Sequence, residues 1–221
     1  MDFPNALREA LLSYVIFIPL LTFHEWAHAW TAWKCGDDTA YQRGRVSLNP
    51  IVHMELIGTV ILPLAGVITG AMGFGFALIG WGKPVPVNPE NLKYPRAQDT
   101  LIAMAGPAMN LALAFLLIGL TKVAVINGQP AVAELCSRAA WFSLFLCFFN
   151  LLPIPPLDGS HLLLNLTRMS YETYYRLAQL GFIVIIVLIQ FPQVQNFLTL
   201  VVKNTFVFMA RPFGLEGLDN R

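Results

Sequence analysis

Apolar stretches alternate with polar segments along the whole chain. A membrane-spanning helix needs about 20 mainly apolar residues, and the stretches at 10–33, 100–126 and 137–152 come closest to such spans. The stretch at 176–191 is shorter and ends at Pro192, and the one at 194–210 contains Lys203 and fits either a last span or an interfacial helix. With the stretch at 54–80, the pattern predicts an all-α polytopic membrane protein with about five to six membrane segments.

The stretch at 54–80 is interrupted by Pro63 and five glycines, so it fits a re-entrant or kinked element as much as a straight span. The polar segment that follows contains Lys83–Val87 (KPVPV). Prolines are tolerated in edge strands, so we expect a short extended or β element here, with a plain interfacial loop as the alternative.

Composition narrows the class of protein. Hydrophobic residues make up 56% of the 221 residues, charged residues only 12%, and mean hydropathy is +0.60. A soluble fold of this size could not bury that much apolar surface, which also argues against disorder and nucleic-acid binding. We expect one integral-membrane domain over 1–221 in a lipid bilayer, with a core at 10–165 and further helices at 166–210.

Three ionisable residues lie close together in the first apolar stretch. His24, Glu25 and His28 form the pattern H-E-x-x-H. Residues i and i+4 share one face of a helix, so both imidazoles can bind one zinc ion, and Glu25 can take a proton from a water molecule at the metal. Ionisable groups inside a membrane span are costly and usually functional, which favours a metal site over a chance match.

Catalytic zinc usually has three protein ligands. Asp158 is the leading candidate for the third, because LPIPPLDG interrupts a helix in an apolar region. The same residue could instead cap the helix that follows it, and both roles could coexist. His161 is more plausible as a lining residue than as a ligand, and His53 is expected at the membrane interface.

HEWAHAW together with NLLPIPPLDG resembles the site-2 protease family of intramembrane zinc metalloproteases. GRVSLNP, WGKPVPV and AGPAMN resemble elements of its short bacterial members, and the resemblance covers residues 20–165. It implies one zinc ion per chain bound by His24, His28 and Asp158, and Glu25 as general acid/base. It also implies a multi-pass protein of the bacterial plasma membrane, without PDZ or CBS domains.

The family's activity is cleavage of transmembrane substrates, whose helices must unwind before hydrolysis. Strand addition to the KPVPV segment would supply new main-chain partners, with Lys83, Val85 and Val87 as candidates. Asn110 and Asn150 are candidate donors to the transition state or, equally, members of interhelical hydrogen bonds. A metal transporter and an inactive scaffold of the same fold are the competing functions, and a homo-oligomer is left open.

The proposed ligands also restrict the topology. His24, His28 and Asp158 all lie toward the C-terminal ends of their apolar stretches, so both stretches should cross the membrane in the same direction. The span 100–126 supplies one return, so we predict that 54–80 dips into the membrane and comes back. The loops 34–53 and 81–99 then share one side, the cytosolic one by a weak excess of basic residues.

Overall fold

The computed structural model describes residues 3–71 and 80–215, and within these ranges it contains helices and turns but no β-strand. Three of the described helices are long and apolar enough to cross a membrane: α1 (Phe3–Lys34), α4 (Pro95–Ile126) and α5 (Pro130–Asn150). Packing divides the chain into an N-terminal unit that ends at Lys93 and a C-terminal unit that begins at Tyr94. The single domain expected over 1–221 stays a prediction.

The N-terminal unit is built on α1, against which α3 (Leu62–Ala71) packs. α1 contains the apolar stretch expected at 10–33 and begins earlier, at Phe3. The polar residues at its start end the apolar run without ending the helix. The shorter elements are α2 (Thr39–Gln42), the 3₁₀ helices η1 (Pro50–Val52) and η3 (Pro89–Asn91), and the π-helix η2 (Leu56–Ile61).

The two ends of the segment that contains η2 and α3 lie side by side. The backbone N–H of Trp81 donates a hydrogen bond to the carbonyl of Gly58 over 3.1 Å. The Thr59 hydroxyl donates to the Trp81 carbonyl over 2.7 Å. The chain therefore leaves through η2 and is back beside that helix at Trp81.

The predicted β element is not formed as a strand. Residues 80–88 lie in neither a helix nor a strand, and side chains and loop carbonyls of the N-terminal unit hold part of this segment, as described below.

Asp37 joins the loop after α1 to the loop before α4. Its carboxylate accepts hydrogen bonds from the Asn88 N–H over 2.7 Å and from the Asn91 amide over 2.8 Å. Burial raises the pKa of Asp37, but the hydrogen bonds from Thr39, Asn91 and Asn88 together outweigh it, so the pKa lies below its ordinary value. The carboxylate is therefore charged at neutral pH, and this link between the loops would weaken only in acid.

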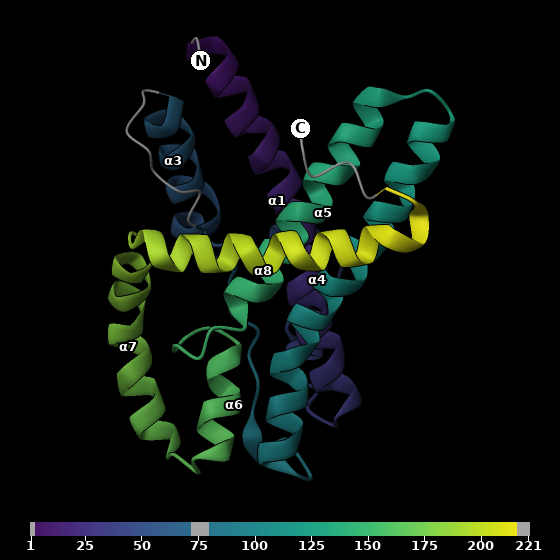
Figure 1. Ribbon diagram of the computed structural model, residues 1–221. Helices are drawn as coiled ribbons and strands as arrows, with labels where there is room; N and C mark the ends of the chain where they lie inside the picture. The colour runs from purple at the N-terminus through teal and green to yellow at the C-terminus, as the bar shows by residue number, and fades with distance from the viewer. Residues whose placement is uncertain (1–2, 72–79, 216–221) are drawn as a thin grey trace. The chain divides into compact units, whose positions relative to one another are not determined.

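The C-terminal unit is a hairpin of α4 and α5 crossed by α8 (Pro192–Ala210), as Figure 1 shows. Small residues at the contact let the helices approach closely, and larger apolar side chains fill the remaining space. The buried core consists of Ala114, Ile118, Ala140, Leu144, Val202, Phe206, Ala210 and Leu215. The remaining elements are α6 (Gly159–Leu166), α7 (Tyr171–Leu188) and the 3₁₀ helix η4 (Arg211–Phe213).

The proline-rich turn between α5 and α6 rests against α7. A Cβ atom at Gly181 of α7 would lie only 1.7 Å from the Pro155 carbonyl oxygen, so only glycine allows this backbone approach. α7, for which the sequence offered no motif, therefore supports the turn that ends at Asp158.

Candidate metal and catalytic site

His24 and His28 form a buried pair on α1. The Nε2 atoms of the two rings are 3.0 Å apart, and the rings meet edge to face with centroids separated by 4.6 Å. The side chains are 4% and 7% exposed. The one-turn spacing of the sequence therefore brings two imidazole nitrogens together, as predicted.

The geometry of this pair suits zinc. Two ligand nitrogens at about 2.0–2.1 Å from a tetrahedral ion are about 3.3 Å apart, close to the separation of the His24 and His28 Nε2 atoms. Neutral imidazole is a common zinc ligand, and both rings present the same nitrogen to one point. The two histidines thus fit two ligands of a single zinc ion.

Glu25 follows His24 on α1 and is half-buried. The backbone of Gly82 lies directly against its carboxylate, since a Cβ atom at residue 82 would be 2.9 Å from Oε1. A larger residue there would press on the carboxylate, so glycine at this position leaves Glu25 room beside the segment 82–87.

Two residues of the N-terminal unit hold the start of this segment. The Arg45 guanidinium donates to the carbonyls of Lys83 and Pro84, in the second case over 3.1 Å. The Lys83 N–H donates to the His53 carbonyl over 2.8 Å. Arg45 lies in the GRVSLNP stretch, but nothing in that stretch indicates which carbonyls its side chain would bind, so only Lys83 was predicted from the sequence.

Arg45 and His53 are both buried, at 4% and 1% exposure. Burial lowers the pKa of Arg45, and the negative charge of Glu25 acts in the opposite direction. Burial also lowers the pKa of His53, a hydrogen bond to the Ser47 carbonyl raises it, and the charge of Arg45 lowers it. His53 is thus packed inside its unit, and its expected position at the membrane interface stays a prediction.

Asp158 lies at the N-terminus of α6 and is half-buried. Its side chain makes no capping hydrogen bond to α6, so the capping role considered from the sequence is not formed. The proline-rich turn ends at Asp158, where α6 begins. Gly181 of α7 packs against the Pro155 carbonyl in this turn.

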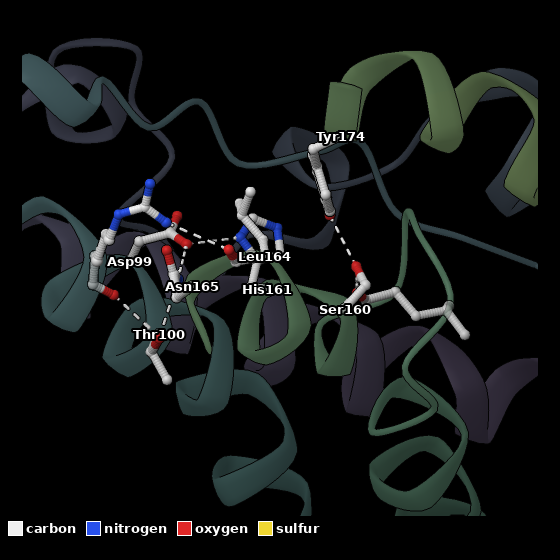
Figure 2. Close-up of polar contacts among 9 residues, drawn as sticks. Asp99, Thr100, Ser160, His161, Leu164, Asn165 and Tyr174 are labelled. Carbon is white, nitrogen blue, oxygen red and sulfur yellow. Dashed lines mark hydrogen bonds and ion pairs between the residues drawn. The ribbon is translucent and has the colours of Figure 1, made fainter. Parts of the chain in front are cut away.

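α6 is tied to α4 by a polar cluster (Figure 2). The buried Asp99 carboxylate of α4 bonds the His161 Nδ1 over 3.0 Å and accepts from the Asn165 amide over 2.6 Å. Ser160 points the other way and shares a hydrogen bond with the Tyr174 hydroxyl of α7 over 2.9 Å. His161 therefore holds the helix that begins after Asp158, consistent with a lining rather than a ligand role.

Of the two candidate asparagines, only Asn150 has a described side-chain hydrogen bond within its helix, and the bond described for Asn110 is made by its main chain. Asn110 is fully buried, and its main-chain carbonyl accepts a hydrogen bond from Ser143 of α5 over 2.7 Å. The Asn150 amide donates to the Leu146 carbonyl of its own helix over 2.9 Å. To serve a substrate, the Asn150 side chain would have to rotate away from that carbonyl.

Comparison with known proteins places the chain in a family. Residues 121–189 match the model of Peptidase family M50. The chain is 36% identical over 193 residues to "Putative zinc metalloprotease YwhC" of Bacillus subtilis, covering 83% of each chain. It is 34% identical over 195 residues to "Putative zinc metalloprotease Rip2" of Mycolicibacterium smegmatis, covering 82% of this chain and 70% of the relative.

No solved structure matches the chain. The two relatives nevertheless align over most of both sequences, and the family match includes Asp158. The chain belongs to Peptidase family M50, the site-2 protease family.

Proposed function

We propose that the protein is a zinc-dependent intramembrane endopeptidase that hydrolyses peptide bonds in transmembrane segments of other proteins. The observation that carries this proposal is the buried His24–His28 pair, with Glu25 between them, on a helix long enough and apolar enough to cross a membrane. The printed names of the relatives, which call both zinc metalloproteases, support the same chemistry.

In this proposal His24, His28 and Asp158 hold the metal. Zinc, when bound, supplies Lewis-acid chemistry that polarises the scissile carbonyl and makes water easier to deprotonate. The Glu25 carboxylate accepts the proton of the attacking water and later gives it to the leaving nitrogen. Burial of the pair keeps bulk water from competing for the site, and the segment 82–87 brings main chain to the side of the base.

The direct test is cleavage of a single-span peptide by the purified protein in detergent. We expect mass spectrometry to find two fragments cut within the apolar segment, to find none after zinc is removed with 1,10-phenanthroline, and to find them again when zinc is restored. Zinc flux into liposomes, with no cleavage under any of these conditions, would instead support the transporter alternative.

We further propose that residues 54–80, of which 72–79 lie outside the described residues, dip into the membrane and return. Two observations support this: Trp81 is hydrogen-bonded beside Gly58, and Asp37 holds the loop 34–53 to Asn88 in the loop 81–99. In the full arrangement of five to six membrane segments, both loops would then lie on one side of the membrane.

Cysteine labelling in sealed vesicles tests this topology. Asp37 is fully buried, so we choose the exposed neighbours Asp38→Cys and Glu90→Cys, made separately in a chain without Cys35, Cys136 and Cys147. We expect a membrane-impermeant maleimide to label both positions from the same side. Labelling from opposite sides would contradict the re-entrant arrangement.

The segment 82–87 is the proposed substrate platform. Pro84 and Pro86 have no N–H, and Lys83 already donates to His53. Within the described residues, no acceptor is bonded to the N–H of Val85 or Val87. These two donors, two residues apart, have the spacing with which an extended peptide pairs on one edge of a strand.

Substitution by proline removes these donors one at a time. We expect Val85→Pro or Val87→Pro to lower kcat/KM for a single-span peptide by about tenfold, since each removes one main-chain hydrogen bond to the substrate. Val85→Ala and Val87→Ala, which keep the N–H and shorten the side chain, are the matched controls. Parental turnover in both proline variants would show that the segment is a plain loop.

A further inference from the structure

Segment 82–87 has few main-chain hydrogen-bond donors with which to be held in place. Pro84 and Pro86 lack the N–H through which neighbouring main chain would normally fix a strand. Among the described residues, its hydrogen bonds to the rest of the N-terminal unit are those of the Lys83 N–H to the His53 carbonyl and of Arg45 to the carbonyls of Lys83 and Pro84. The side chain of Arg45, which has several donors, thus takes the place of the main-chain hydrogen bonds that a neighbouring strand would supply.

We propose that Arg45 is the positioning residue of the substrate platform: its guanidinium holds the Lys83–Pro84 backbone so that the platform lies beside Glu25. This inference rests on the proposed protease function and adds to it a residue that contacts neither substrate nor metal.

Three properties make Arg45 suited to this role. Its planar fork of N–H groups can bond two successive carbonyls at once, which a lysine ammonium at the same distance cannot do in fixed geometry. It is almost fully buried, so losing its two carbonyl partners would leave buried donors without hydrogen bonds. The negative charge of Glu25 attracts the guanidinium, so the group that fixes the platform is also drawn toward the base.

Gly82 connects the backbone that Arg45 holds to the catalytic base Glu25. The Gly82 backbone touches the Glu25 carboxylate and precedes the two carbonyls that Arg45 holds. If the carbonyls of Lys83 and Pro84 were released, the segment would be free to move away from Glu25, and with it the N–H groups of Val85 and Val87. Substrate binding would suffer before the metal site did.

The experiment compares Arg45→Gln and Arg45→Lys with Arg43→Gln, a matched control at an exposed arginine two residues away. Four quantities are measured on purified protein: zinc content, the Ki of acetohydroxamate as a small metal-directed inhibitor, KM and kcat for a single-span peptide, and deuterium exchange of a peptide covering 80–88.

We expect Arg45→Gln to raise KM about tenfold or more, with a smaller change in kcat, because the carbonyls of Lys83 and Pro84 lose their charge-assisted partner. Deuterium exchange at 80–88 should accelerate, while zinc content and the hydroxamate Ki stay within about twofold of the parent. Arg45→Lys keeps the charge and can bond one carbonyl, so its KM and exchange should lie between those of the parent and Arg45→Gln. Arg43→Gln should match the parent.

Parental KM and parental exchange in Arg45→Gln would overturn the proposal. Loss of zinc or of hydroxamate binding would also overturn it, since Arg45 would then support the whole unit rather than the platform; if Arg45→Gln fails to fold, Arg45→Lys gives the same decision. If the parent binds zinc but cleaves no peptide, the protease function fails, and the exchange measurement still decides whether Arg45 holds residues 80–88.

Discussion

Glu25→Gln is expected to abolish peptide cleavage and leave zinc binding intact. Glutamine has nearly the size and shape of glutamate, so it can remain next to His24 on α1 and against Gly82 without a rearrangement. Its amide, however, cannot accept the proton of an attacking water. A general acid/base of this kind contributes about 10²–10⁴-fold to the rate. Because Glu25 acts both as base and as acid, the loss of cleavage rate should lie at the upper end of this range.

Zinc content and cleavage must be measured on the same preparation. Glu134→Gln makes the same chemical change at an exposed residue of α5 and should cleave at the parental rate. Retained cleavage by Glu25→Gln would remove Glu25 from the mechanism. A transporter would respond differently, because its flux depends on the residues that bind the ion and far less on a proton acceptor beside them.

The sequence predicted those parts of the site that depend on regular spacing. Two histidines four residues apart lie one turn apart on any helix, so the His24–His28 pair needed no tertiary information. The glycines and the proline inside the apolar run 54–80 disfavour a straight span, and the hydrogen bond between Trp81 and Gly58 agrees with that interpretation, but the re-entrant element itself stays a prediction.

Arg45 and Gly181 could not be found in this way. Each acts through a backbone oxygen that is distant in sequence, and nothing in the residues around them indicates which oxygen that will be. The apolar stretch 10–33 lies within α1, which begins earlier, at Phe3: hydropathy indicates where a helix could enter a membrane, whereas backbone hydrogen bonds decide where the helix begins.

The second large effect is expected for Asp158→Ala, which should bind zinc at least about 100-fold more weakly than the parent and should not cleave peptide. Loss of a supporting residue around a metal typically costs 10–100-fold in affinity, and loss of a ligand should cost more. The Asp158 side chain makes no capping hydrogen bond to α6, and the turn before it is held by Gly181 through the Pro155 carbonyl, so the helix should survive the substitution.

Competition with a fluorescent zinc chelator would give the affinity, and circular dichroism would report helix content. His161→Ala is the informative control, because His161 lies one turn further along α6 and bonds Asp99. We expect this variant to bind zinc more weakly by no more than the 10–100-fold that is typical of a supporting residue. Asp38→Ala removes an exposed acid of the N-terminal unit and should bind zinc as the parent does. If Asp158→Ala retains parental affinity while His161→Ala loses it, the third ligand is the histidine, and the proposed ligand set is wrong at that one position.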